Sequence, residues 1–425
     1  MKIGLAQLNT HVGAIETNTD KVLVSARQAR DELGCDLIVY PELTLSGYPP
    51  EDLLLHKGMQ KRVIEALEVV RRDVMGITLC LGYPEYEDKN LFNSGIVLRD
   101  GQVLANHRKW ILPNYAVFDE KRYFEAGTDS TVVELSGIHF ALTICEDAWE
   151  PEPCHAAADA GAEILLVING SPYHMHKQSM RETMLGDRAR EIGLPLVYVN
   201  MVGGQDELVF DGGSVAIDAE GRTSMRAPAF EEGIYLVEVE RRSSDICLRE
   251  QELAPVLSTE EAVYKALVLG TRDYVNKNGF KNVVLGLSGG VDSALTLCVA
   301  VGALGADRVR TVMMPSRYTS KMSLEDSAKQ AAKMGVQHDV LSIEPIFESI
   351  RGVLIDVFKG LPENTTEENI QARCRGLLLM AISNKLNCML LTTGNKSEMA
   401  VGYATLYGDM AGGYAPLGDV YKMEV

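Results

Sequence analysis

Three residue types that together could hydrolyse an amide follow predicted strands in the first half of the chain. Glu42 follows an apolar strand expected over 36–40, Lys109 lies in the segment HRKWILPNY, and Cys145 follows a strand expected over 139–144. A thiol can attack an acyl carbon while a carboxylate moves its proton and an ammonium stabilises the oxyanion. We also expect the ammonium to lower the pKa of the thiol. Taken singly, these residues would also suit a buried structural thiol, a turn cap and a solvated lysine.

A second chemical motif, SGGVDS at 288–293, lies between a strand expected over 283–287 and a helix. Paired glycines let backbone N–H groups approach an anion, and the helix N-terminus adds positive potential. Asp292 has the side chain to hold Mg²⁺. The GK[ST] ending of a Walker loop is missing, so transfer of a γ-phosphate is not the expected chemistry. A purely structural turn would explain one glycine more readily than the whole string.

Two runs of alternating strands and helices must position these motifs. The first run predicts a layered α/β sandwich, and from about 239 to 255 the pattern lapses into charged residues that suggest a linker. The expected strands are 2–9, 36–40, 77–83, 139–144, 164–169 and 194–200, the helices are 16–33, 51–72, 151–160 and 177–192, and the hairpins are 94–104 and 213–218.

The second run predicts a parallel sheet with ligands at the carboxyl ends of its strands. Ser258 and Glu261 form a capping box that opens a helix. The domain boundaries we expect are 1–245, a linker over 246–258, and 259–425. The expected strands are 282–287, 309–314, 339–343 and 388–393, and the helices are 259–276, 291–303, 324–334, 345–358 and 366–385.

Composition limits the classes of protein to consider. The chain has 425 residues, enough for two or three domains, and its formal net charge of -18 argues against a nucleic-acid-binding surface. No apolar run approaches the roughly 20 residues of a membrane span. The 8 cysteines form no CxxC pair, so we expect neither a zinc site nor a disulfide framework, and a cytoplasmic location. The histidines at 174 and 176 lack a full set of metal ligands nearby, so we expect no metal in the first half.

The motifs of the first half resemble those of a known superfamily. PEL at 41–43, HRK at 107–109 and ICED at 144–147 resemble, in order and spacing, the Glu–Lys–Cys motifs of the nitrilase (carbon–nitrogen hydrolase) superfamily. That resemblance implies a four-layer α-β-β-α sandwich. It also implies that Cys145 is the nucleophile, Glu42 the general base and acid, and Lys109 the oxyanion support, with the backbone N–H of Glu146 as a second oxyanion donor.

Within that superfamily the first half is most similar to the glutaminase domains of glutamine-dependent NAD synthetases. The resemblance implies a glutamine pocket in which Glu146 pairs with the α-amino group and Ser171 forms a hydrogen bond with it. The branch often has an arginine where Lys177 aligns, and lysine keeps the charge but loses the bidentate fork. Tyr115 is the fourth implied pocket residue, for which ordinary packing is the alternative.

The second half resembles the ATP pyrophosphatases, through the SGGVDS string, and among them the NAD synthetases. The further segments that carry this resemblance are NIQARCRG at 369–376, TTGNKSE at 392–398 and the stretch 402–422. The implied fold is a parallel-sheet, Rossmann-like domain, and a solvated helix face is the alternative explanation for Arg373. The implied site residues are Ser288, Gly289, Gly290, Asp292, Ser293, Arg373 and Thr393 for ATP, Asp409 and Lys422 for deamido-NAD, and Asp292 and Glu398 for Mg²⁺.

Joined in one chain, the two resemblances imply a glutamine-dependent NAD synthetase. A cysteine-dependent glutaminase would supply ammonia that amidates adenylated deamido-NAD, with release of AMP and pyrophosphate. The implied partners are glutamine, ATP, deamido-NAD and further copies of the chain, without nucleic acid or membrane. The chain ends at Val425, earlier than the family pattern. The alternatives are a nitrilase-type amidase fused to an ATP pyrophosphatase with another acceptor, and a protein active only in its glutaminase half.

Overall fold

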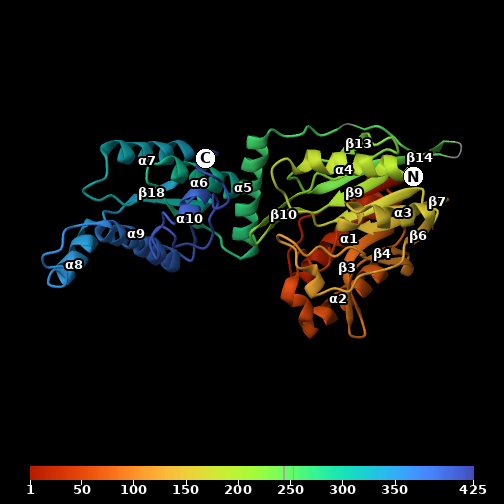
Figure 1. Ribbon diagram of the computed structural model, residues 1–425, viewed down its shortest axis with the longest axis horizontal. Coiled ribbons are helices and arrows are strands. Elements are labelled where there is room, and N and C mark those ends of the chain that lie inside the picture. Colours follow the sequence, from red (N-terminus) through yellow and green to blue (C-terminus); the bar gives the residue numbers. More distant parts are fainter. Residues whose placement is uncertain (243–244, 252) are drawn as a thin grey trace. The chain divides into compact units, whose positions relative to one another are not determined.

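The computed structural model describes residues 1–242, 245–251 and 253–425 and contains two compact units, Met1–Ala266 and Leu267–Val425 (Figure 1). Each unit has its own sheets and its own buried apolar clusters, so each is described by itself. Among the residues that are described, no helix is both long and apolar enough to cross a bilayer.

The first unit is built on two sheets, one of seven strands in the order β15-β14-β1-β2-β3-β4-β5 and one of six in the order β13-β12-β9-β8-β7-β6. The first contains β1 (Lys2–Gln7), β2 (Leu37–Val39), β3 (Thr78–Glu87), β4 (Asn90–Arg99), β5 (Gln102–Arg108), β14 (Gly233–Arg242) and β15 (Asp245–Leu248). The second contains β6 (Thr131–Leu135), β7 (Ile138–Ile144), β8 (Ile164–Asn169), β9 (Leu196–Asn200), β12 (Val215–Ile217) and β13 (Thr223–Arg226).

These sheets pack face to face and helices cover their outer faces, which confirms the expected four-layer sandwich (Figure 1). Val39 of one sheet and Phe140 of the other lie in a shared buried cluster. Ile38 points the opposite way into the cluster beneath the first helical layer, and Leu165 does the same beneath the second. The covering helices are α1 (Ile15–Asp31) and α2 (Lys57–Asp73) on the first sheet and α3 (Pro151–Asp159) and α4 (Lys177–Ile192) on the second.

Three features of the first unit differ from the expectations. Strand β14 and the short β15 occupy part of the charged stretch read as a linker, and β14 pairs antiparallel with β1. Val237 and Val239 of β14 are buried and alternate with glutamates, which is a strand pattern with one face towards the core. The helix expected over 51–72 is broken at His56, whose backbone is extended (ψ 122), and the hairpin of β10 (Val202–Gln205) and β11 (Leu208–Asp211) was not predicted.

The second unit contains a four-stranded sheet, ordered β18-β17-β16-β19, in which every pairing is parallel, as expected. Val283 and Val284 of β16 lie in different buried clusters, so helices pack on both faces. Strand neighbours β16 and β19 bring the SGGVDS and TTGNKSE segments to the same edge. The strands are β16 (Val283–Gly286), β17 (Val309–Met313), β18 (Gln337–Val340) and β19 (Met389–Leu391).

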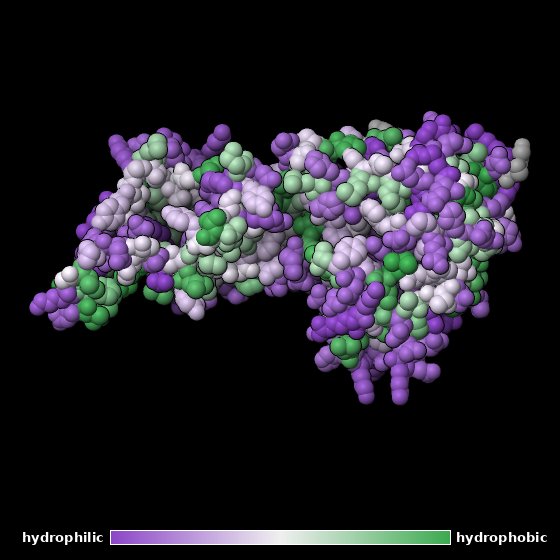
Figure 2. Space-filling view, in the orientation of Figure 1, coloured by the Kyte–Doolittle hydropathy of each residue, from purple (hydrophilic) through white to green (hydrophobic). Residues whose placement is uncertain are grey.

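The helices of this part of the chain begin with α5, whose first turn is capped by Ser258 Oγ accepting from the N–H of Glu261 at 3.2 Å. Figure 2 shows a hydrophobic patch at the end formed by α8 and the segment that follows it. Val353, Ile355 and Val357 there are 79%, 68% and 71% exposed. The helices are α5 (Thr259–Lys277), α6 (Val291–Leu304), α7 (Lys321–Met334), α8 (Glu344–Leu354), α9 (Thr365–Leu386) and α10 (Lys396–Val401).

Candidate active sites

A buried ion pair joins two of the three residues expected to catalyse acyl chemistry. Lys109 Nζ donates to Glu42 Oε1 at 2.7 Å and to Glu120 Oε1 at 2.9 Å. The same Glu42 oxygen accepts from Asn93 Nδ2 at 2.7 Å, and Glu42 Oε2 accepts from the N–H of Gly170 at 2.8 Å. Four hydrogen-bonding groups therefore fix this carboxylate and its ammonium partner in one orientation.

The turn after β2 delivers Glu42 to this position. Leu43, the next residue, has a left-handed backbone (φ 47). Gly82 of β3 passes so close to this turn that a side-chain carbon there would overlap the backbone of Pro41 and Leu43. Glycine at this point of β3 thus lets the turn pack directly against the strand.

Cys145 opens the short turn η3 (Cys145–Ala148) immediately after β7, with φ 50 and only 3% of its surface exposed. Burial and the charge of Glu42 raise the pKa of its thiol well above the ordinary value, although Lys109 acts in the opposite direction. The expectation that lysine leaves this thiol with a lowered pKa was therefore wrong, because burial and the nearby carboxylates outweigh one ammonium. The resting thiol keeps its proton and needs a base.

Glu120, a residue that the sequence did not single out, completes the charge balance. Burial raises its pKa to about 7, with Glu42 adding to the rise and Lys109 opposing it. Burial disfavours the Lys109 ammonium, but Glu120 and Glu42 together raise the lysine pKa well above its ordinary value. Tyr48 OH also donates to Glu120 Oε1, at 3.0 Å. The site thus holds a permanent cation beside two carboxylates.

The residues assigned to the glutamine pocket gather around Cys145. Tyr115 OH donates to Glu146 Oε1 at 2.8 Å, and Tyr115 is 55% exposed, so core packing does not account for it. Lys177 lies with Nζ 4.5 Å from the centre of the Trp149 ring. Burial lowers the pKa of Lys177, and the charges of Cys145 and Glu146 act on it in the opposite direction.

Ser171, the fourth of these residues, is buried directly after Gly170. Asn200 holds its backbone from both sides, accepting from the Ser171 N–H at 2.9 Å and donating to its carbonyl at 3.1 Å. The position of Ser171 is therefore fixed by the end of β9 rather than by a flexible loop.

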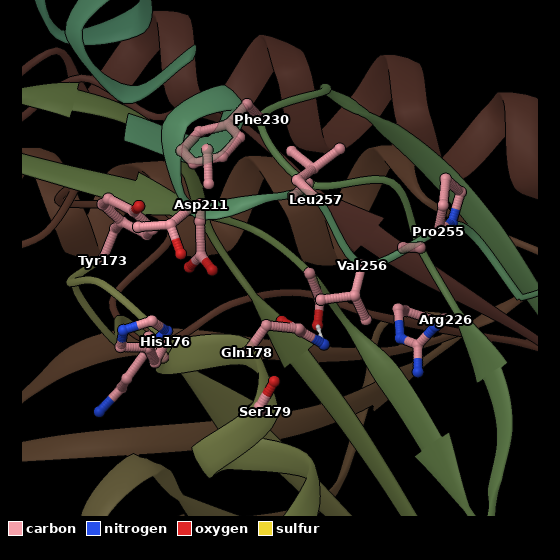
Figure 3. A pocket seen from close by; sticks show the side chains of 16 residues that line it. Tyr173, His176, Gln178, Ser179, Asp211, Arg226, Phe230, Pro255, Val256 and Leu257 are labelled. Carbon is pink, nitrogen blue, oxygen red and sulfur yellow. Dashed lines mark hydrogen bonds between the residues drawn. The ribbon is translucent and has the colours of Figure 1, made fainter. Parts of the chain in front are cut away.

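A cavity of about 80 Å³ lies beside the first turn of α4 (Figure 3). Tyr173, Gln178 and Phe230 line it together with the chain at 255–257. Lys177 is among its described lining residues, but the three residues expected to be catalytic are not. It is therefore a separate hollow behind the glutamine pocket.

In the second unit, the SGGVDS loop has the backbone expected of an anion cradle. Gly289 has φ 81, and a side-chain carbon there would lie 2.5 Å from the carbonyl oxygen of Ser323. Ser288 Oγ accepts from the N–H of Gly290 at 3.2 Å and lies 3.1 Å from Ser293 Oγ. Gly290 is the N-cap of α6, so the positive end of this helix faces the loop.

Asn395 connects the two carboxylates expected to bind Mg²⁺. Its Nδ2 donates to Asp292 Oδ1 at 3.1 Å and its backbone N–H donates to Glu398 Oε2 at 3.2 Å. Asp292 Oδ2 also forms an ion pair with Lys422. No group of three or more acidic, histidine or cysteine side chains that could hold a metal occurs among the described residues. Two carboxylates fit Mg²⁺, which is commonly held by one or two carboxylates, waters and substrate phosphates.

The remaining expected residues are distributed around this edge of the sheet. Thr393 follows β19 directly. Asp409 and Glu398 line a cavity of about 360 Å³. Arg373 is exposed, and its described hydrogen bond, at 3.2 Å, goes to the carbonyl of Leu406 rather than to the phosphate loop. The structure therefore brings the loop, Asp292, Glu398 and Lys422 together, but not Arg373.

Family comparisons divide the chain in a corresponding way. The carbon–nitrogen hydrolase family model matches residues 2–245, and the NAD synthase model matches residues 263–425. A curated glutamine-dependent NAD(+) synthetase of Xylella fastidiosa (strain Temecula1 / ATCC 700964) is 46% identical over 427 residues, which cover 100% of this chain and 78% of that protein. The chain belongs to the glutamine-dependent NAD(+) synthetase family.

Solved structures agree with this family assignment. The glutamine-dependent NAD⁺ synthetase of Acinetobacter baumannii, in complex with ADP, superposes with a TM-score of 0.96 at 46% identity, covering 100% of this chain and 80% of that one. An amidase of Nesterenkonia sp. from the nitrilase superfamily has a TM-score of 0.51 at 29% identity and covers 56% of this chain and 89% of its own. The latter match is to the nitrilase fold alone.

Sequence reasoning missed several polar groups that shape the two sites of this NAD(+) synthetase family member. Glu120 and Asn93 touch the Glu42–Lys109 pair, and Asn395 links the two carboxylates of the second site. Asn395 lies in the TTGNKSE segment, so a signal for it was present. Glu120 and Asn93 stand in stretches without a motif, and only their contacts in the fold identify them.

Proposed function

We propose that this family member forms NAD from deamido-NAD with glutamine as the nitrogen donor and ATP as the activating co-substrate. The observation that carries the proposal is the buried Glu42–Lys109 pair acting on Cys145, in a chain that also carries the SGGVDS loop. The proposed domains are 1–245, a linker over 246–258, and 259–425. Release of ammonia beside an activated carboxyl group is useful because ammonium itself is a poor nucleophile at neutral pH.

In the first half, the Cys145 thiol passes its proton to Glu42 as sulfur attacks the side-chain amide carbon of glutamine. The Lys109 ammonium and the N–H of Glu146 stabilise the oxyanion. Collapse of the tetrahedral intermediate breaks the carbon–nitrogen bond, and Glu42 returns the proton to the leaving ammonia. Glu42 then takes a proton from water, which attacks the thioester, and glutamate leaves as the thiol regains its proton. A carboxylate beside a protonated thiol is what this sequence of steps requires.

Glutamine itself is held by Tyr115, Glu146, Ser171 and Lys177 in this proposal. Glu146 carries the charge that pairs with the α-amino group, while the Lys177 ammonium suits the α-carboxylate. Because Tyr115 donates to Glu146, it orients that carboxylate rather than adding a charge of its own. The described contacts support this division of roles.

In the second half, a carboxylate oxygen of deamido-NAD attacks the α-phosphorus of ATP and pyrophosphate leaves. Ammonia then attacks the resulting acyl adenylate, and AMP leaves as the amide forms. The N–H groups of the SGGVDS loop hold the phosphates, with Ser288 and Ser293 as further donors. Asp292 and Glu398 would hold Mg²⁺, which supplies charge neutralisation to the phosphates when bound. We assign Arg373 and Thr393 to ATP and Asp409 and Lys422 to deamido-NAD.

We also propose that the protein assembles from several copies and works in the cytoplasm. The exposed apolar residues that follow α8, among them Val353 and Ile355, suit burial against a second copy. All eight cysteines are free, which suits a reducing compartment. Size-exclusion chromatography with light scattering tests the first of these proposals.

The deciding experiment measures NAD and AMP formed from deamido-NAD and MgATP, in parallel with glutamine and with ammonium. NAD from both nitrogen sources supports the proposed function. NAD from ammonium alone would contradict the proposed glutaminase, and glutamate release without NAD would favour another acceptor or activity confined to the first half.

A further inference from the structure

One buried carboxylate ties together two segments of the first unit that are distant in sequence. Asp147 is 0% exposed. Its Oδ1 accepts from the backbone N–H of Trp110 at 3.0 Å and of Ile111 at 2.8 Å, and its Oδ2 accepts from the N–H of Ile144 at 3.0 Å. Hydrogen bonds to an ionised acceptor are stronger than neutral ones, so this clasp is a firm link.

The two segments carry the proposed lysine and the proposed nucleophile. Lys109 directly precedes Trp110, and Cys145 directly follows Ile144. Lys109 leaves the end of β5 in the seven-stranded sheet, whereas Cys145 leaves β7 in the six-stranded sheet. Because these strands belong to different sheets, no strand ladder sets the distance between their ends. The carboxylate of Asp147 supplies that link at this edge.

Nothing in the surroundings of Asp147 leaves room for a substrate. Both of its oxygens are occupied by backbone donors, and His107 Nε2 lies 3.6 Å from Oδ2. His107 is itself buried and its Nδ1 lies 3.3 Å from Thr131 Oγ1. The carboxylate is therefore enclosed by protein groups and can affect the reaction only through the segments that it holds.

We propose that Asp147 is a positioning residue of the amidase reaction, setting the placement of the Lys109 ammonium relative to the Cys145 thiol. The inference rests on the proposed function. Cys145 has φ 50, a backbone conformation that surrounding contacts must hold in place, and the bond to the preceding N–H is one of them. Misplacement of a reacting group by about 1 Å can cost on the order of 10²-fold in rate.

The test is Asp147→Asn, which keeps the shape but replaces one acceptor oxygen by an NH₂ group. At least one backbone N–H of the clasp then faces a donor and loses its partner. The expected result is a fall of about 10²-fold in kcat with glutamine, a change in the KM for glutamine below about 3-fold, and ammonium-driven synthesis within about 2-fold of the parent. Alkylation of Cys145 by iodoacetamide, followed by mass spectrometry of its peptide, should slow by about 10-fold.

Glu182→Gln is the matched control. Glu182 also accepts several hydrogen bonds in the first unit, from Gln178, Thr223 and Arg226, but it belongs to α4 and does not touch the clasp. This variant should leave kcat, KM and the alkylation of Cys145 unchanged.

A kcat with glutamine within about 3-fold of the parent in a folded Asp147→Asn protein would overturn the inference. So would a loss that disappears at low temperature together with recovery of the circular dichroism spectrum, because that pattern reports stability alone. If Asp147→Asn does not fold, Asp147→Ser, which keeps one small acceptor, is judged by the same criteria.

Failure of the proposed function would be recognised separately, since the parent protein would then release no glutamate from glutamine. The alkylation rate would still decide about Asp147, because it needs no turnover. A slower reaction of Cys145 in Asp147→Asn supports the positioning role, and an equal rate overturns it.

Discussion

Lys109 Nζ lies 2.7 Å from Glu42 Oε1, and neither side chain reaches solvent. A buried carboxylate without a cation would cost several kcal/mol, so the ammonium is what allows Glu42 to be held away from water as a base. The second carboxylate on the same ammonium, Glu120, has its pKa raised to about 7. One cation therefore serves two carboxylates, and Glu120 is the one that takes up a proton near neutral pH.

Lys109→Met should destabilise the first unit in a pH-dependent way. Removing the cation leaves two buried carboxylates unpaired, which we expect to lower the free energy of unfolding by about 3–5 kcal/mol at pH 8. At pH 5 Glu120 is protonated, because its raised pKa lies above that pH, and the loss should be smaller. The native Lys109 pKa is raised, so its own contribution persists at every pH below the ordinary lysine value of about 10.4.

Urea unfolding at the two pH values measures this difference. Lys109→Met/Glu120→Gln should recover part of the stability at pH 8, because one of the unpaired charges is gone. An equal loss for Lys109→Met at pH 5 and pH 8 would contradict the charge balance described here.

Cys145→Ala should abolish synthesis of NAD from glutamine and leave synthesis from ammonium within about 2-fold of the parent, because the thiol acts only on glutamine. Parallel assays with the two nitrogen sources measure this. Cys35→Ala, which removes another buried thiol of the first unit, should retain both activities. Equal loss with both sources in a folded Cys145→Ala protein would disprove the two-site scheme.

Glu42→Gln should have opposite effects on ionisation and on turnover. The charge of Glu42 raises the pKa of the Cys145 thiol, so its removal should lower that pKa and increase the thiolate fraction at a given pH. Turnover of glutamine should nevertheless fall by about 10²–10⁴-fold, because the base that moves the proton is lost. The pH dependence of iodoacetamide alkylation at Cys145 gives the first quantity, and glutamate release gives the second. A midpoint that moves to higher pH would refute this electrostatic account.

Tyr115→Phe should weaken glutamine binding more than catalysis. The variant removes the hydroxyl that orients Glu146, and we expect a rise in the KM for glutamine of about 3–10-fold with little change in kcat, as for the loss of one hydrogen bond. Tyr123→Phe is the matched control, since Tyr123 OH donates to Asp52 at 2.8 Å without contact to the pocket. A fall in kcat at unchanged KM would place Tyr115 in the chemical step instead.

The sequence predicted those parts of the site that lie at strand ends within motifs. Glu42 and Cys145 were found because each follows a short apolar strand, and parallel strands end at a common edge. Glu120 could not be found, because its role depends on a loop that folds back onto Lys109, and no periodicity records such a contact. Strand β14 was missed for a related reason. Its glutamates hid the alternation of Val237 and its neighbours, whose burial depends on pairing with a strand at the other end of the domain.

The ion pair between Asp292 and Lys422 leads to a prediction about Mg²⁺. In this structure the Lys422 ammonium occupies one oxygen of the carboxylate that we assign to the metal. A cation bound at Asp292 must compete with that ammonium. Lys422→Met should therefore lower the Mg²⁺ concentration that gives half-maximal AMP release with ammonium, by about 2–5-fold, as expected for an exposed ion pair worth up to 1 kcal/mol.

The same variant should raise the KM for deamido-NAD if Lys422 contacts that substrate, so the two effects are measured in separate titrations at saturating ATP. Lys396→Met removes a comparable exposed pair, with Asp419, and should alter neither titration. Asp292→Ala should impair synthesis with glutamine and with ammonium alike, because both routes need the activated acceptor. A Lys422→Met protein that needs more Mg²⁺ than the parent would show that the lysine assists the metal site, and the competition inferred from this ion pair would then be wrong.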